Sequence, residues 1–357
     1  MRHIACILCE NGLGHFKRLV GLLHALVQQQ PDLRIDLVCE QWQLDLTRDW
    51  EKTGILYRPE TNLHTGYLAP AVRWSLEPDF YTEERLYAWE KRLAAIPALQ
   101  TADVLLCDNY VGALNLRSDA VLMGSYLWAD IFLSAFPDHP TIQQFADRSY
   151  ELLAKYQPPV ICVEEIAMPG VRQRARAQGM PWFGQAPKVH RTPDDRKGQI
   201  ALLAGATSIA QQGTSQLLGL LLQSTDLDIR IPDRLMDSLN PQGLERIKPF
   251  GFTIADFADC DLVICRPGIG TVTDSIVANT PMLLFSEGNN LEMEHNTQVL
   301  ENLEVASSIG STFSPDQVVE EIHRLLETET YTKLHKALAQ RPVNGYDRAV
   351  EWFNNHL

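Results

Sequence analysis

Apolar residues in the first part of the chain fall alternately into short continuous runs and into stretches with helical spacing. Residues 3–9 form an apolar run, and a turn containing Gly12 and Gly14 follows it. From His15 to Gln30 apolar side chains recur every three or four residues, as in an amphipathic helix. A further apolar run, from Ile35 to Cys39, predicts a second strand. This order of strand, turn, helix and strand indicates a βαβ unit in a parallel sheet.

The same alternation continues toward the middle of the chain. Further strands are predicted at 104–107, 120–123 and 160–163, and helices at 82–96 and 141–156. Residues 167–198 differ, because they are rich in proline, glycine and charged side chains, which is the composition of a linker.

A second set of strand and helix patterns follows that stretch. Strands are predicted at 200–203, 229–231, 262–265 and 282–285, and helices at 211–223, 271–278, 295–302, 315–327 and 346–355. The predicted fold class is therefore α/β, with two doubly wound Rossmann-like domains. We expect an N-terminal domain over 1–166, a linker over 167–198 and a C-terminal domain over 199–340. A last helix within 341–357 is expected to pack back on the N-terminal domain.

Composition and charge exclude some classes of partner. The 357 residues contain 31 Lys and Arg against 45 Asp and Glu, a net charge of −14. An acidic chain without a basic block is a poor nucleic-acid binder and is repelled by anionic membranes. No apolar run is long enough for a membrane span, and the run at the N-terminus is too short for a signal peptide.

The seven cysteines indicate a reduced, cytoplasmic protein. They are an odd number in a long chain and lie mostly inside apolar runs, which is typical of core thiols. Cys6 and Cys9 have C-x-x-C spacing, but both lie in the predicted first strand, so we interpret them as structural. The sequence shows no other cluster of metal ligands, and we expect neither a metal nor a cofactor.

Two polar residues at strand ends are candidates for chemistry in the first half. His15 follows the first glycine turn, and Asp108 ends the strand at 104–107. The carboxyl ends of parallel strands meet where open α/β sheets bind ligands. His15 could act there as a general base, with Asp108 holding its second nitrogen. Plain helix-start and strand-cap roles are the alternatives.

The segment 248–298 carries the strongest motif. After the strand at 262–265, Arg266 precedes Gly268 and Gly270, and a helix opens near Thr271. Backbone N–H groups at such a helix start, together with an arginine, suit a diphosphate. Asp274, about one turn later, could accept hydrogen bonds from ribose. A plain strand-to-helix turn with a solvated arginine is the alternative.

At this point the sequence resembles the glycosyltransferases with two Rossmann-like domains facing across a cleft, the GT-B fold. It is similar to the uridine-diphosphate glycosyltransferases and to the bacterial N-acetylglucosaminyltransferase that makes the peptidoglycan precursor. The resemblance is carried by residues 10–18, 104–110, 203–208 and 248–298.

The resemblance implies roles for individual residues. His15 matches the catalytic base of the family and Asp108 the acid that orients it. The implied donor-binding residues are Gly12, Gly14, Thr207, Phe250, Phe252, Arg266, Gly268, Gly270, Thr271, Asp274, Asn290 and Glu292. Within that set, Phe250 or Phe252 would cover the nucleobase. Asn290 and Glu292 would replace the sugar-contacting pair of the family, which is not intact in this chain.

The sequence therefore predicts an inverting, metal-independent transferase that moves a hexosyl or N-acetylhexosaminyl group from a nucleotide sugar, with UDP as the favoured nucleotide, to an unidentified acceptor. A nucleotide-sugar hydrolase of the same fold and a catalytically silent sugar-nucleotide-binding protein are the alternatives. A dehydrogenase is less favoured, because neither glycine turn has the full dinucleotide spacing. The sequence does not indicate an oligomeric state.

Overall fold

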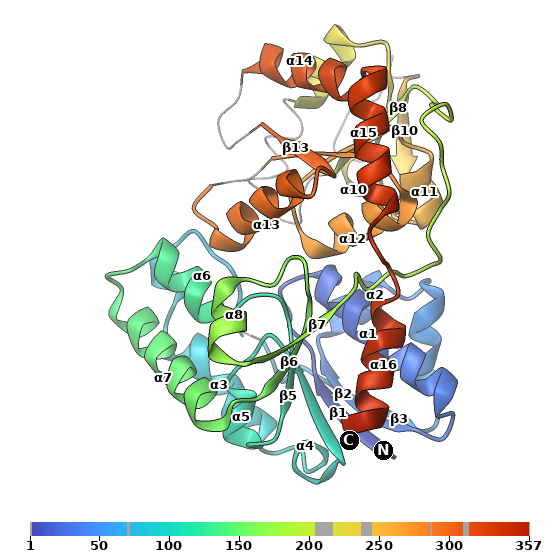
Figure 1. The fold of residues 1–357 in the computed structure, drawn as a ribbon. Coiled ribbons are helices and arrows are strands. Elements are labelled where there is room, and N and C mark those ends of the chain that lie inside the picture. Colours follow the sequence, from blue (N-terminus) through green and yellow to red (C-terminus); the bar gives the residue numbers. More distant parts are fainter. Residues whose placement is uncertain are drawn as a thin grey trace. The chain divides into compact units, whose positions relative to one another are not determined.

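The computed structural model describes residues 2–69, 72–203, 217–236, 245–285, 288–309 and 314–356. The chain divides into two compact units (Figure 1). Unit 1 comprises residues 1–183 and 344–357, and unit 2 comprises residues 184–343.

Unit 1 is built on a parallel sheet with the strand order β3-β2-β1-β4-β5-β6-β7. The strands are β1 (His3–Ile7), β2 (Arg34–Cys39), β3 (Thr61–Thr65), β4 (Val104–Asp108), β5 (Val121–Met123), β6 (Pro159–Val163) and β7 (Arg176–Met180). The helices are α1 (Leu13–Gln29), α2 (Gln41–Leu46), α3 (Glu83–Leu93), α4 (Ala98–Thr101), α5 (Ala113–Leu116), α6 (Trp128–Ala135), α7 (Pro140–Tyr156), α8 (Pro169–Arg174) and α16 (Gly345–His356), with 3-10 turns η1 (Glu51–Tyr57) and η2 (Pro78–Phe80).

Unit 2 repeats this plan with the strand order β10-β9-β8-β11-β12-β13, again all parallel. Its strands are β8 (Gln199–Leu203), β9 (Asp228–Pro232), β10 (Ile247–Phe250), β11 (Leu262–Cys265), β12 (Met282–Leu284) and β13 (Ala306–Ser308). Its helices include α10 (Asp233–Met236), α11 (Ile254–Ala258), α12 (Ile269–Ala278), α13 (Leu291–Asn302), α14 (Pro315–Leu326) and α15 (Thr328–Ala339). The predicted fold class, two doubly wound α/β units, is confirmed.

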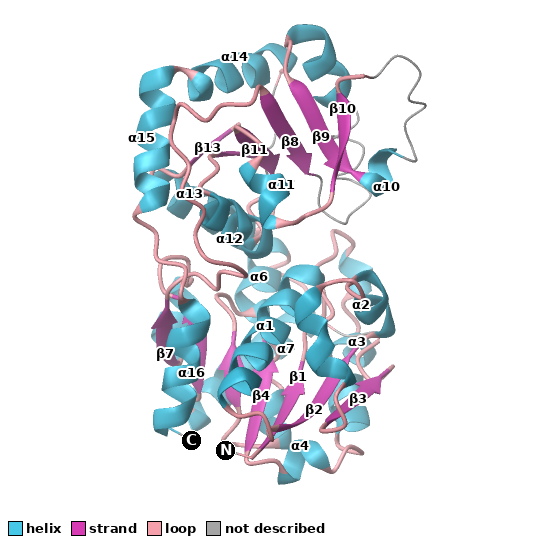
Figure 2. Cartoon of the chain, turned by 90° about the vertical axis from the view of Figure 1, so that its right-hand side faces the viewer, coloured by secondary structure: helices cyan, strands magenta, loops and turns pink. Residues whose placement is uncertain are grey.

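Burial on both faces explains why the central strands are continuous apolar runs. Helices lie on both faces of the unit 1 sheet (Figure 2), so strand residues that point either way are removed from water. Residues 4–9 of β1 and the segment after it are fully buried. All seven cysteines are buried and unpaired. Burial raises the pKa of the Cys6 and Cys9 thiols, which fits a structural role.

The stretch expected to be a linker, 167–198, is partly built into the first sheet. Pro169 occupies the first turn of α8, where its missing N–H costs nothing. β7 then adds a parallel edge strand to β6. The division between the units therefore falls after Phe183 and not after residue 166. Pro169 and Gly170 open α8 and Gly179 lies in β7, whereas residues 184–198 contain no helix or strand before β8 begins at Gln199.

The C-terminal helix returns to the first unit. α16 packs against α1, and Tyr346 donates a hydrogen bond to the carbonyl of Lys17 at 3.4 Å. A Cβ atom on Gly21 would collide with the Tyr346 ring. Glycine in the middle of α1 thus permits the close approach of the two helices. The helix that carries His15 is consequently held by the end of the chain.

Candidate active site

His15 lies in the first turn of α1, where a tight backbone turn brings it close to the end of β1. The N–H of Gly12 donates to the carbonyl of Glu10 at 2.9 Å. Gly12 itself has a φ of 127°, a conformation that favours glycine. It forms the N-cap of α1, and Gly14 is already inside the helix. Both glycines therefore serve the sharp entry into the helix, and His15 follows directly.

The structure places Asp108 next to His15, as the sequence predicts. β1 and β4 are neighbours, with Ile7 paired to Cys107, so the carboxyl ends of the two strands coincide. Nδ1 of His15 lies 2.8 Å from Oδ2 of Asp108. The Asp108 side chain is fully buried and that of His15 is 13% exposed. The carboxylate accepts the Nδ1 proton, so the lone pair of the imidazole is on Nε2.

Arg18 is a third member of this cluster that the sequence analysis missed. It lies one turn after His15 on α1, and its Nη2 donates to Oδ1 of Asp108 at 2.5 Å. Burial alone would raise the pKa of the Asp108 carboxyl. The charges of Arg18 and His15 and their hydrogen bonds outweigh burial and hold that pKa below its ordinary value. The signal that could have revealed Arg18 is its charge, three residues after His15 in a helix with many apolar positions.

Tyr126 completes the surroundings of the imidazole. It follows β5, and its hydroxyl lies 3.3 Å from Nε2 of His15, with the two rings edge to face at 6.2 Å. Nε2 is therefore the nitrogen that accepts a proton, with Tyr126 beside it. No sequence motif marks Tyr126, since only the neighbouring position of β5 in the sheet brings it there.

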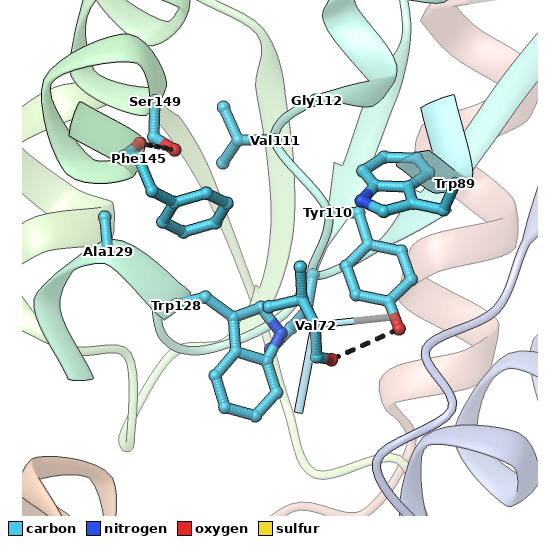
Figure 3. A pocket seen from close by; sticks show the side chains of 10 residues that line it. Val72, Trp89, Tyr110, Val111, Gly112, Trp128, Ala129, Phe145 and Ser149 are labelled. Carbon is cyan, nitrogen blue, oxygen red and sulfur yellow. Dashed lines mark hydrogen bonds between the residues drawn. The ribbon is translucent and has the colours of Figure 1, made fainter. Parts of the chain in front are cut away.

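An aromatic-lined pocket lies in the same unit (Figure 3). It contains about 240 Å³ not filled by protein atoms, part of which is open solvent, and is lined by Val72, Trp89, Asn109, Tyr110, Val111, Gly112, Trp128, Ala129, Phe145 and Ser149. Tyr110 and Trp128 both line this pocket. Asp130 is not among its lining residues and accepts a hydrogen bond from Tyr150 at 2.6 Å.

The pocket contains polar atoms without a protein partner. Among the described residues, neither amide atom of Asn109 nor Nε1 of Trp128 has a hydrogen-bond partner, although these side chains are only 6% and 3% exposed. Buried polar groups in this state are stabilised by a ligand or water. Trp128 packs edge to face against Tyr126, with ring centroids 5.1 Å apart, and Tyr126 in turn lies beside His15.

In unit 2 the strongest motif forms the turn from β11 into α12. Gly268 is the N-cap of α12, and no heavy atom lies within 4 Å of the position of a Cβ atom on it. The next residues, Ile269, Gly270 and Thr271, are the first of the helix, whose N–H groups have no partner within it. Arg266 immediately precedes this turn and is half-buried. The arrangement offers backbone donors and a cation to an anion.

Asn296 braces this turn and was not predicted. It lies on α13 and is 1% exposed, and its Nδ2 donates to the carbonyl of Pro267 at 2.9 Å. This contact fixes the turn between Arg266 and Gly268 to a separate helix. Asp274 is buried further along α12.

Asn290 has a structural role that differs from its expected one. It is the N-cap of α13, and its Oδ1 accepts a hydrogen bond from the backbone N–H of Met293 at 3.2 Å. Asn290 is 5% exposed, and its carbonyl oxygen serves as the cap of the helix. Glu292 follows in the first turn of the same helix and is half-buried.

Phe250 does not occupy a nucleobase-covering loop. It is the last residue of β10, is 1% exposed and packs edge to face against Phe252 and Phe257 at 5.1 and 5.0 Å. The expectation for this residue is wrong, because its ring is part of the core. Phe252 is half-buried and has a φ of 58°, so of the two rings it is the one that reaches the surface. Thr207 lies outside the described residues.

The described residues contain no group of three or more His, Cys, Asp or Glu side chains arranged to hold a metal ion. Across the same part of the chain, no helix has both the length and the apolar character to cross a bilayer.

Part of the chain is similar to known glycosyltransferases. Residues 236–346 match the glycosyltransferase family 28 C-terminal domain. Two curated relatives named uncharacterized glycosyltransferase, from Methanosarcina mazei and Methanosarcina acetivorans, are each 29% identical over 99 and 103 residues. These alignments cover 27% and 28% of this chain and 26% of each relative, so the chain matches about a quarter of their length.

Solved structures match the whole fold. The glycotransferase of kitacinnamycin has a TM-score of 0.69 at 14% identity, covering 99% of both chains. A UDP-glucosyltransferase from Polygonum tinctorium capable of glucosylating indoxyl has a TM-score of 0.69 at 12% identity, covering 99% of this chain and 98% of that one. The spinosyn rhamnosyltransferase SpnG complexed with thymidine diphosphate has a TM-score of 0.60 at 17% identity, covering 99% of this chain and 100% of that one. The fold is that of the GT-B glycosyltransferases.

Proposed function

We propose that this chain is a glycosyltransferase that moves a hexosyl or N-acetylhexosaminyl group from a nucleoside diphosphate sugar, preferably a UDP-sugar, to an acceptor hydroxyl. The observation that carries the proposal is the His15–Asp108 pair, with Nδ1 and Oδ2 2.8 Å apart and Nε2 available as the proton acceptor. The family match over 236–346 and the GT-B fold support the same reaction class.

The proposed reaction is a single displacement. Nε2 of His15 takes the proton of the acceptor hydroxyl while its oxygen forms a bond to the anomeric carbon. The bond between that carbon and the diphosphate oxygen breaks, and its electron pair leaves with the nucleoside diphosphate. Attack opposite the leaving group inverts the anomeric configuration. Asp108 stabilises the imidazolium that forms.

The turn at the start of α12 would hold the leaving group. Arg266 and the backbone N–H groups of the first helical residues supply positive charge where negative charge develops on the diphosphate. Gly268 and Gly270 leave the backbone open to the phosphates, and Thr271 and Asp274 are proposed to contact the diphosphate and the ribose. These groups provide the charge that a divalent cation supplies elsewhere, so the proposed reaction needs no metal. The buried, unpaired thiols fit a cytoplasmic site of action.

Dinucleotide binding at the first turn is disfavoured by Glu40. A Rossmann site uses a carboxylate after the second strand to bind ribose hydroxyls. Glu40 follows β2, but its Oε1 accepts hydrogen bonds from the N–H groups of Leu68 and Ala69 at 2.9 and 3.2 Å. The carboxylate is buried and already accepts hydrogen bonds from the backbone of this chain.

Binding of nucleotides tests the donor half of the proposal. Wild-type protein and Arg266→Ala are titrated by calorimetry with UDP, TDP, GDP and ADP. We expect the tightest binding with UDP, and an affinity loss of about tenfold or more in the variant. Arg230→Ala serves as a control, because Arg230 forms ion pairs with Asp256 and Asp259 and is not among the residues proposed to contact the donor. Equal UDP affinity in wild type and Arg266→Ala would contradict the proposed diphosphate site.

Product analysis tests transfer against hydrolysis. UDP-glucose and UDP-N-acetylglucosamine are each incubated with the protein, with and without a panel of hydroxylated acceptors, and sugars and conjugates are resolved by mass spectrometry. Transfer predicts conjugates that appear only with an acceptor. Free sugar formed at the same rate in every mixture would identify a hydrolase instead, and intact donor throughout would indicate a binding protein.

A further inference from the structure

Arg18 forms, with His15 and Asp108, a three-membered cluster in which each carboxylate oxygen receives a different donor. Oδ2 of Asp108 receives Nδ1 of His15 at 2.8 Å, and Oδ1 receives Nη2 of Arg18 at 2.5 Å. The Arg18 side chain is 8% exposed and that of Asp108 is fully buried. The ion pair is therefore shielded from water and from salt.

The guanidinium also lies close to the imidazole itself. Nη2 of Arg18 is 3.4 Å from Nδ1 of His15. Because Nδ1 gives its proton to Asp108, both atoms are donors and no hydrogen bond between them is favourable. The contact instead brings a permanent positive charge next to a ring that becomes positive when it accepts a proton.

Asp108, Arg18 and Tyr126 each have a polar atom within 3.4 Å of a ring nitrogen of His15. Asp108 comes from β4, Arg18 from α1 itself, and Tyr126 from the segment after β5. The hydroxyl of Tyr126 lies 3.3 Å from Nε2. The charge balance at the ring is therefore set by one carboxylate and one guanidinium, which oppose each other. Asp108 favours the imidazolium and Arg18 disfavours it.

We propose that Arg18 is a positioning residue that holds Asp108 in line with His15 and compensates the charge of the carboxylate, so that Asp108 orients the imidazole while its pull on the base is opposed by a neighbouring cation. A carboxylate alone would stabilise the imidazolium, and a base that is already protonated takes no proton from an acceptor. With the compensating guanidinium, the carboxylate still fixes the tautomer while the resting imidazole keeps its lone pair. The consequence for transfer rests on the proposed function, but the effect on His15 does not.

Nuclear magnetic resonance tests the inference without turnover. The protein is labelled at the histidine imidazole carbons, and the His15 signal is assigned by its loss in His15→Gln. In Arg18→Met the titration midpoint of this signal should rise by about one pH unit or more, because a positive charge has been removed. In Arg18→Lys, which keeps the charge, the midpoint should stay close to that of wild type.

A charge cycle keeps the test valid if Arg18→Met leaves Asp108 uncompensated and the variant unfolds. Asp108→Asn alone should lower the midpoint, and the double variant Arg18→Met/Asp108→Asn should bring it back up by about one pH unit, since both charges are then absent. A purely structural Arg18 predicts that the double variant matches Asp108→Asn. That result, or an unchanged midpoint in folded Arg18→Met, would overturn the inference.

The chain supplies a matched control in a second histidine–aspartate cluster. Nε2 of His3 and Nε2 of His64 contact the two oxygens of Asp36 at 2.7 and 2.8 Å, and Nε of Arg34 lies 3.7 Å from the same carboxylate. The Arg34 side chain is 58% exposed, so water screens its charge. Arg34→Met should barely move the His3 midpoint. If Arg34→Met moves the His3 midpoint as far as Arg18→Met moves the His15 midpoint, the larger effect expected from the burial of Arg18 is refuted.

Where transfer is measurable, the pH profile adds a second readout. The acidic limb of kcat/KM should move to higher pH in Arg18→Met, so the loss of activity should be largest at the acidic end of the profile and smallest at its alkaline end. Absence of any transfer in wild type, together with the expected midpoint shifts, would refute the proposed function and leave the role of Arg18 intact. If wild type transfers sugar and Arg18→Met shows the same pH profile as wild type, the proposed function stands and the role of Arg18 is refuted.

Discussion

Nδ1 of His15 lies 2.8 Å from Oδ2 of Asp108, although 93 residues separate them in the chain. The contact exists because β1 and β4 are adjacent parallel strands, so the helix that follows one and the residue that ends the other share one edge of the sheet. The buried carboxylate fixes one nitrogen of the imidazole and leaves the other for proton transfer. The chemistry we propose depends on this pair.

Asp108→Asn should separate the orienting role of the carboxylate from the shape of its side chain. An amide is neutral and can hold the wrong tautomer of His15, so we expect transfer to fall by roughly a hundredfold or more. The variant also leaves the Arg18 cation buried without a counter-ion, which should cost about 3 kcal/mol in stability. Urea denaturation and initial rates measure the two effects. Full activity in a folded variant would show that Asp108 does not orient the base.

Asn296→Ala should weaken donor binding although Asn296 is not expected to touch the donor. The variant loses the hydrogen bond to the carbonyl of Pro267 and leaves that oxygen unsatisfied, at a cost of about 1–3 kcal/mol. The turn at Gly268 would then lose its brace, and UDP affinity should fall several-fold by calorimetry. Thr297→Ala is the control, because Thr297 donates to the carbonyl of Met293 within α13 at 2.8 Å. The account fails if both variants bind UDP like wild type.

Substitutions of Asn290 distinguish a helix cap from a sugar contact. Asn290→Ala should destabilise the protein by about 1 kcal/mol, whereas Asn290→Ser retains a capping oxygen and should be nearly neutral. If capping is the whole role of Asn290, Asn290→Ser binds UDP-glucose with the affinity of wild type, and the same holds for UDP. A selective loss of affinity for UDP-glucose, with UDP binding retained, would restore Asn290 as a sugar-contacting residue.

His335 should make unit 2 less stable in mild acid. Burial, reinforced by the charges of Arg191 and Arg196, lowers the pKa of His335 to about 4, while an exposed histidine in the unfolded chain titrates near 6.5. The folded state therefore favours the neutral ring. Its contribution is complete above the unfolded value and is lost as the pH falls from about 6.5 to about 4.

The size of this effect follows from the same shift. The loss should be on the order of 3 kcal/mol at most between those two pH values. His335→Gln, which cannot be protonated, should show a flatter dependence of unfolding free energy on pH over this window. Parallel curves for wild type and variant in urea titrations at several pH values would refute this reading of His335.

Sequence patterns predict those parts of the fold in which apolar side chains mark the buried positions. β1, β4 and β11 are continuous apolar runs because helices cover both faces of their sheets. β3 and β7 are edge strands with the sequences TNLHT and RAQGM, and no apolar run identifies them. They join the sheet through backbone hydrogen bonds, which any side chain permits. The predicted linker was consequently too long at its N-terminal end.

The same distinction applies to the candidate site. His15 and Asp108 were predictable because each stands at the end of a recognisable strand or turn. Tyr126 and Asn296 act through partners that are distant in the chain, so their positions in the sequence carry no information about those partners, and for Arg18 only its spacing from His15 was a signal. The expectation for Phe250 rested on a short motif that placed the residue in a loop. In the structure its ring packs against Phe257 in the core.

The most direct test of the account is transfer by wild type and His15→Ala under identical conditions. Each protein is given UDP-glucose or UDP-N-acetylglucosamine with the same panel of hydroxylated acceptors, glycosylated products are quantified by mass spectrometry, and UDP binding is measured in parallel. We predict products from wild type, a loss of at least about a hundredfold in His15→Ala, and unchanged UDP affinity. Equal product formation by the two proteins would contradict the central claim that His15 is the base.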